Sequence, residues 1–97
     1  MDWVWTWSGK SFGYIDNNCL WTHDGRHVGK VVGDEIYGKK GKYLGEIKSD
    51  NRLITSKSKR SKHSNSFVPY GKRGAYTKYA DYAGFVMYAG YDDFPEL

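Results

Sequence analysis

The chain has 97 residues, of which 39% are hydrophobic and 18% aromatic, with 12 glycines and a formal net charge of +4. This length indicates a single domain over residues 1–97 with a thin core. The single cysteine, Cys19, excludes an intramolecular disulfide scaffold, and no apolar run approaches the roughly 18–20 residues that a membrane span requires. We therefore expect a cytoplasmic protein that does not contact a membrane.

The first predicted element is a strand in which tryptophans alternate with other residues. Trp3, Trp5 and Trp7 would share one face of this strand, because successive side chains of a strand point to opposite faces. Three indole rings on one face are more than a small core readily absorbs. We therefore expect Trp3 or Trp7 to contact a ligand or a partner.

A repeat of about 16 residues extends from this strand to residue 54, in units over about 5–21, 21–37 and 37–54. Each unit reads Gly-basic-x-apolar-Gly-x-apolar, then a polar turn, then Leu20-Trp21, Ile36-Tyr37 or, after one inserted residue, Leu53-Ile54. A repeat has to bury something in every copy, so the equivalent positions should form a shared core. These positions are the aromatic residues Trp5, Trp21 and Tyr37 and the second glycines Gly13, Gly29 and Gly45.

The polar turns between the apolar stretches indicate β-hairpins. Asp16-Asn17-Asn18, Gly33-Asp34 and Ser49-Asp50-Asn51 consist of residues that tolerate positive φ. A lone hairpin with strands of four to six residues is unstable, so the copies must pack against one another. The sequence thus predicts an all-β protein, a small closed ring or barrel of hairpins with pseudo-four-fold symmetry.

Residues 54–97 form a degenerate fourth unit. A basic loop over 56–66 has no hydrophobic periodicity, and 70–74 (Tyr-Gly-Lys-Arg-Gly) resembles the turn at 37–41. The stretch 85–88 (Phe-Val-Met-Tyr) fits a strand, which could close the ring together with the N-terminal strand. A closed ring has no exposed strand edges.

The tandem pattern over residues 3–54 resembles the four-fold β-flower family of small bacterial proteins. It is carried by Gly-Lys-x-Phe-Gly-x-Ile followed by Leu-Trp, by Asp-Gly-Arg-His-Val-Gly-x-Val followed by Ile-Tyr, and by Gly-Lys-Tyr-Leu-Gly-Glu-Ile followed by Leu-Ile. The resemblance implies a small all-β fold with a pseudo-four-fold arrangement of hairpins. It implies no activity and no binding residues.

The charge is segregated along the chain. Residues 55–79 contain seven Lys or Arg and no acid, whereas residues 80–97 contain four acids and no Lys or Arg. A basic block that alternates with aromatic residues suits a ligand with phosphates and flat rings, although it is equally typical of a solvated loop. The candidate ligand-binding residues are Trp3, Trp7, Lys57, Lys59, Arg60, Lys62, Lys72, Arg73, Tyr76 and Tyr79.

No pattern indicates a metal site, a cofactor or a catalytic centre. His23 and His27 are four residues apart, but Asp24-Gly25 between them indicates a turn rather than a helix. Cys19 lacks a patterned partner, and no glycine-rich phosphate loop precedes a helix. We expect a protein that is not an enzyme.

These features predict a binding module for an anionic ligand, either a nucleotide, held by sequestration, or a nucleic acid. Two alternatives remain open at this point. Exposed tryptophans and tyrosines could anchor a protein interface, including one between copies of the chain, or they could stack on the rings of a carbohydrate.

Overall fold

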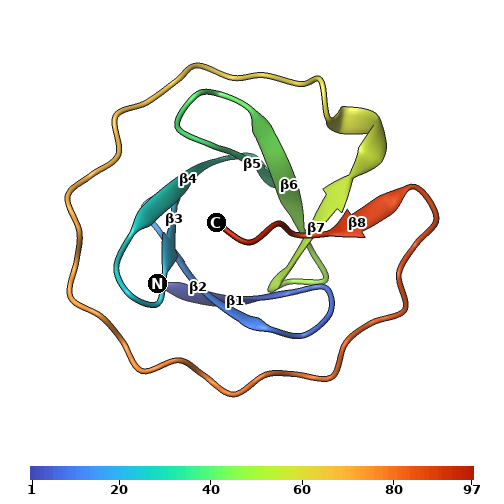
Figure 1. The fold of residues 1–97 in the computed structure, drawn as a ribbon, viewed down its shortest axis with the longest axis horizontal. Helices are drawn as coiled ribbons and strands as arrows, with labels where there is room; N and C mark the ends of the chain where they lie inside the picture. The colour runs from blue at the N-terminus through green and yellow to red at the C-terminus, as the bar shows by residue number, and fades with distance from the viewer.

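In the computed structural model, which describes all 97 residues, seven short strands form a closed barrel (Figure 1). The strands pair in chain order, and β1 also pairs with β7 in parallel, which closes the ring. The all-β prediction and the sealing of the ring by the N-terminal strand are therefore confirmed. The strands are β1 (Asp2–Thr6), β2 (Ser11–Asp16), β3 (Cys19–Thr22), β4 (His27–Val32), β5 (Glu35–Tyr37), β6 (Tyr43–Lys48), β7 (Arg52–Ser56) and the additional β8 (Tyr91–Asp93).

The hairpin turns lie where the polar residues predict them. Asn17 and Asn18 have φ values of 49° and 60°, and Ser49 and Asp50 have 51° and 67°. Such pairs of positive φ values give the backbone twist that a tight hairpin needs. The β1–β2, β3–β4 and β5–β6 pairs each contain a register shift, which follows Val4, Leu20 and Ile36 respectively. A bulge at the same place in each repeat bends the sheet far enough to close a small barrel.

The centre of the barrel interior contains one fully buried aliphatic side chain from each of β1, β3, β5 and β7. Val4, Leu20, Ile36 and Leu53 hold equivalent repeat positions, are at most 2% exposed, and form one cluster with Phe94. The close approach of the strands is visible at the second glycines. A Cβ on Gly13 or Gly45 would lie 2.0 Å or 2.5 Å from a carbonyl oxygen of the next strand, and one on Gly29 would lie 2.9 Å from the side chain of Ile36.

The aromatic residues of the repeat are buried, but not in this interior. Trp5, Trp21 and Tyr37 directly follow the interior residues and so face outward, where they are 6%, 1% and 4% exposed. The expected shared core is therefore two layers, with aliphatic side chains inside the barrel and rings outside it. Rings from several repeats would not fit in an interior that these aliphatic side chains and the ring of Phe94 already fill.

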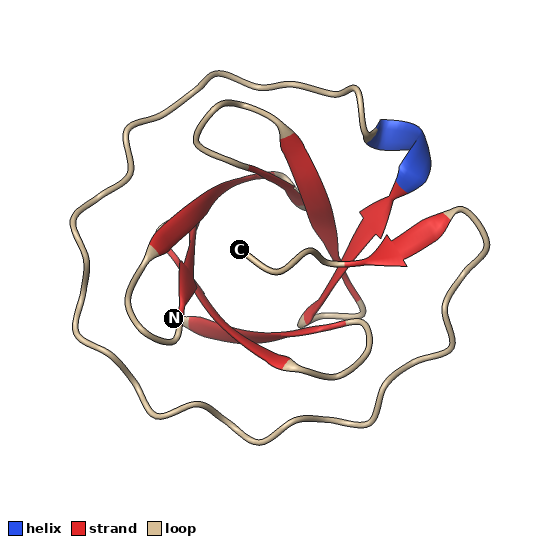
Figure 2. Ribbon diagram, viewed as in Figure 1, coloured by secondary structure: helices blue, strands red, loops and turns tan.

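Residues 63–90 form a belt that contains no helix or strand and encircles the barrel (Figures 1 and 2). The belt is held at three hairpin tips by backbone hydrogen bonds spaced nine residues apart. The N–H groups of Ser64, Arg73 and Tyr82 donate to the carbonyl oxygens of Gly41, Gly25 and Gly9, and those of Phe67, Tyr76 and Phe85 donate to Lys39, His23 and Trp7.

The belt follows its own nine-residue repeat. Aromatic residues recur in it at two positions: Phe67, Tyr76 and Phe85 at the first, and Tyr70, Tyr79 and Tyr88 at the second. The expected closing strand over 85–88 was wrong, because the backbone of this segment binds a hairpin tip and not a strand edge. Beyond its short parallel pairing with β1, β7 pairs instead with β8, which follows the belt and runs antiparallel to it.

The contact between belt and hairpin tips can be tested at a glycine. Gly25 has a φ of +92°, and a Cβ there would lie 2.0 Å from the carbonyl oxygen of Arg73. Gly33 has a φ of +65°, but a Cβ there meets nothing within 4 Å. Both Gly→Ala substitutions should cost about 1–2 kcal/mol of backbone strain, measured by urea denaturation. Only Gly25→Ala should also speed tryptic cleavage after Lys72 and Lys78, and equal cleavage rates in the two variants would contradict the contact.

Candidate functional site

The belt covers the tryptophans that the sequence offers as binding residues. Trp7 is 2% exposed, and its Nε1 donates a hydrogen bond to the carbonyl oxygen of Val86 at 3.0 Å. The ring of Trp3 lies edge-on to Tyr76 and Tyr79, with centroids 5.4 Å and 4.7 Å apart. The four candidate residues Trp3, Trp7, Tyr76 and Tyr79 therefore contact other parts of the same chain. Rings of the belt pack on both tryptophans.

Most of the candidate cations are also paired within the molecule. Lys57 and Arg60 form ion pairs with Asp92 of β8. Arg73 forms an ion pair with Asp16 at 2.9 Å, and its guanidinium lies 3.9 Å from the ring centre of Trp21. The segregated charges of the sequence thus meet as ion pairs between distant segments.

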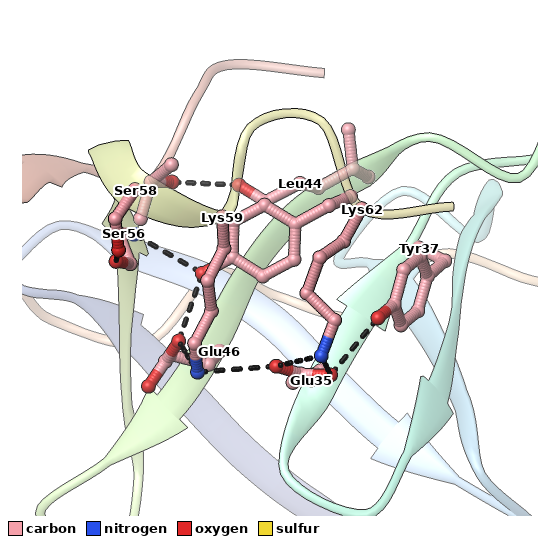
Figure 3. Close-up of polar contacts among 10 residues, drawn as sticks. Glu35, Tyr37, Leu44, Glu46, Ser56, Ser58, Lys59 and Lys62 are labelled. Atoms are coloured by element: carbon pink, nitrogen blue, oxygen red, sulfur yellow. Dashed lines mark hydrogen bonds and ion pairs between the residues drawn. The ribbon is translucent and has the colours of Figure 1, made fainter. Parts of the chain in front are cut away.

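Lys59 and Lys62 join an ionic network on the outer face of the third hairpin (Figure 3). Glu35 of β5 and Glu46 of β6 are direct cross-strand neighbours, an arrangement that is repulsive unless a cation bridges it. The Nζ of Lys59 provides that bridge, at 2.9 Å from Glu46 Oε1 and 3.1 Å from Glu35 Oε2. Tyr43 donates its hydroxyl hydrogen to Glu46 Oε1 at 2.8 Å. We call Glu35, Tyr43, Glu46, Lys59 and Lys62 the latch, because their contacts fix the chain where the belt begins.

The latch shifts the proton affinities of its members. The hydrogen bond from Lys62 lowers the pKa of Glu35 to about 2, with smaller contributions from Lys59 and Tyr37, although burial acts in the opposite direction. Hydrogen bonds to Glu46 and Glu35 raise the pKa of Lys59, and burial raises that of Tyr43. Glu35 is thus held ionised as a structural group.

The pH dependence of stability follows from the lowered pKa of Glu35. The ionised carboxylate stabilises the folded state above its ordinary pKa of 4.5, and this stabilisation is lost as the pH falls towards about 2. We expect Glu35→Gln to flatten the decrease in Tm between about pH 6 and pH 3, measured by calorimetry. Asp34→Asn, at the neighbouring turn, should leave the decrease as in the wild type. A Glu35→Gln profile as steep as that of the wild type would contradict the latch.

Open space remains at one end of the barrel, which we call the mouth. The tips of the β1–β2, β3–β4 and β5–β6 hairpins surround it, and the chain end lies at its centre (Figure 1). Three cavities of about 380, 500 and 460 Å³ lie around this chain end, and Leu97 lines all of them.

The cavity of about 500 Å³, between the second and third hairpins, is basic. Its lining includes the cations Arg26, Lys39 and Lys72 and no carboxylate side chain, whereas the other two cavities both include Asp93. We call it the basic cavity. Its remaining lining residues are His27, Val28, Gly38, Leu44, Pro69, Tyr70 and Leu97.

His27 supports the wall of the basic cavity without adding charge. Its Nδ1 accepts a hydrogen bond from the backbone N–H of Tyr70 at 2.9 Å, which places the ring proton on Nε2, 2.9 Å from the carbonyl oxygen of Gly29. Burial lowers the pKa of His27, so the ring is neutral at pH 7. It stacks on Tyr70 with centroids 5.3 Å apart.

A family model described as "4-fold beta flower protein" matches residues 1–87, which include β1 to β7 and most of the belt. The chain belongs to this 4-fold beta flower family. The resemblance found in the sequence over residues 3–54 is thereby confirmed and extended into the belt. No curated protein and no solved structure matches the chain.

Of the residues that line the basic cavity of this beta flower chain, only Lys72 was among the binding residues predicted from the sequence. Arg26 and Lys39 were missed as binding residues, although a signal existed for the first. Arg26 holds the basic position that directly follows the first glycine of each repeat, with Lys10 and Lys42 as its equivalents. All three line mouth cavities.

The structure contains no group of three or more side chains suited to hold a metal ion. Its single helix, the 3-10 turn Lys57–Lys59, is too short to cross a membrane. Burial raises the pKa of the Cys19 thiol, a direction opposite to the one that activates a nucleophile.

Proposed function

We propose that this beta flower protein is a non-enzymatic binding module for an anionic ligand of the nucleotide class, and that the basic cavity is its site. One observation supports this assignment most strongly: three cations converge on a cavity whose lining has no carboxylate side chain. A concave site lined by one sign of charge concentrates the field and attracts ions of opposite sign.

Two of these cations are available to a ligand. Lys39 and Lys72 form no ion pair or side-chain hydrogen bond within the molecule, in contrast to Lys57, Lys59 and Lys62. Arg26 contacts Asp24 at 3.4 Å and donates to the main-chain oxygen of Leu97 at 2.8 Å. Guanidinium and ammonium groups are the usual partners of phosphate oxygens.

The remaining walls suit the non-phosphate part of a nucleotide. Val28, Leu44 and Pro69 provide apolar surface, and the ring of Tyr70 is 67% exposed at the same cavity. Pockets for small ligands usually combine such apolar surface with a few polar groups, in volumes of roughly 300–1,000 Å³. A sequestering module needs no catalytic group, which agrees with the raised pKa of Cys19. A free cysteine and a nucleotide ligand would both suit the cytoplasm.

A protein interface is the second candidate. Val68 and Val86 hold the same position in two belt repeats, and each is 89% exposed. A partner, including a second copy of the chain, could contact this outer row of the belt. Carbohydrate stacking on the tryptophans has less support, because Trp7 is 2% exposed and belt rings cover Trp3.

Calorimetric titration with ATP and with inorganic tripolyphosphate tests the proposed function. Binding should weaken strongly between about 50 and 200 mM salt, because phosphate contacts are screened. Lys39→Gln combined with Lys72→Gln should weaken binding at least about tenfold, since each removes a charge-assisted hydrogen bond. Lys40→Gln, which removes one charge from the turn that contains Lys39 but lies outside the cavity, should have little effect.

The two probes separate the parts of the ligand that are recognised. Tighter binding of ATP than of tripolyphosphate would show that the base contributes. An absence of binding by both probes at low salt would overturn the proposed function, and so would an equal loss of affinity in Lys40→Gln.

A further inference from the structure

The chain end occupies the axis of the mouth. Phe94 is 4% exposed in the barrel core, and its ring lies edge-on to Phe12 at 5.3 Å. From there Pro95–Leu97 extends across the mouth, with Leu97 lining all three cavities and Pro95 two of them. The three cavities are therefore parts of one axial space that this segment, which we call the tail, divides.

The tail brings negative charge to a basic rim. Lys10, Arg26 and Lys42, the equivalent basic residues of the three repeats, line the cavities that surround it. Glu96 of the tail lines the same cavity as Lys10 and Arg26. Asp24 and Asp93 line that cavity as well, so Glu96 adds to the negative charge that competes there with a phosphate for Lys10 and Arg26.

The tail is held weakly beyond Phe94. The hydrogen bond from the Arg26 guanidinium to the main-chain oxygen of Leu97 is the only one that the structure contains for Pro95–Leu97. Glu96 is exposed, and Leu97 retains 37% of its accessible surface. Segments with so few buried contacts detach at little cost in free energy.

We propose that Pro95–Leu97 is a built-in occupant of the anion site, and that a ligand with several phosphates binds by displacing it. Displacement frees Arg26 from Leu97 and joins the basic cavity to its neighbours, so that Lys10 and Lys42 face the same ligand. This inference rests on the proposed function and adds to it the ligand class, an oligophosphate chain, and competition by the tail.

The experiment follows the methyl NMR signals of Leu97 in the full chain during titration with tripolyphosphate. Displacement should move these signals to random-coil positions at saturation, while those of Leu20 in the barrel core stay in place. Glu96→Gln, which makes the occupant less anionic, should tighten binding by about two- to fivefold at low salt. Asp34→Asn removes the same charge at a hairpin turn outside the mouth cavities and should leave the affinity unchanged.

The outcomes separate this inference from the proposed function. Tripolyphosphate binding in which the Leu97 signals keep their folded positions, and in which Glu96→Gln has wild-type affinity, would overturn displacement and leave the basic cavity as the site. Failure of wild-type protein and Glu96→Gln alike to bind the probe would overturn both proposals. Tighter binding by Glu96→Gln and Asp34→Asn alike would indicate a general charge effect and would also contradict displacement.

Discussion

The interior of the barrel holds one fully buried aliphatic side chain from each of β1, β3, β5 and β7 together with the ring of Phe94, and the rest of the structure depends on this tight packing. Val4, Leu20, Ile36 and Leu53 fill that space, so the larger residue that follows each of the first three must face outward. Exposed rings on this scale would be a liability for a small protein. The outer aromatic face therefore needs a cover, and the belt is that cover.

The belt binds the hairpin tips and covers the outer aromatic face of the barrel. Its nine-residue repeat spans the distance from one hairpin tip to the next, so that Phe85, Tyr76 and Phe67 each reach an equivalent place. At the third hairpin, Glu35 and Glu46 form the cross-strand pair that Trp3 and Tyr14 form at the first. Lysines contact this pair, whereas belt rings contact Trp3. Rings and cations that are used in this way are not free for another ligand, whereas Lys39 and Lys72 at the mouth line one cavity and have no ion pair.

Much of the barrel could be predicted because local chemistry determines it. The glycines at a fixed spacing of 16 and turns such as Asn17-Asn18 specify hairpins wherever they occur, and several similar hairpins must pack together. The closing partner of β7 was predictable as well, since the N-terminal strand Trp3-Val4-Trp5 had the same pattern as later strands.

The belt and the mouth could not be predicted in the same way. An extended segment that pairs with turns, not strands, has neither a two-residue nor a helical periodicity, so its nine-residue repeat gave no secondary-structure signal. The contact between Trp3 and Tyr79 joins residues that are far apart in the chain, and only the path of the belt brings them together. The basic cavity likewise combines Arg26, Lys39 and Lys72 from three separate segments.

Hydrogen exchange of the belt amides, followed by NMR, tests most directly whether the belt covers the barrel. We expect slow exchange for Arg73, Tyr76, Tyr82 and Phe85, whose N–H groups donate to hairpin carbonyls, and fast exchange for intervening residues such as Thr77. Uniformly fast exchange over residues 63–90 would contradict the account, because the aromatic face would then be open and free to bind a ligand.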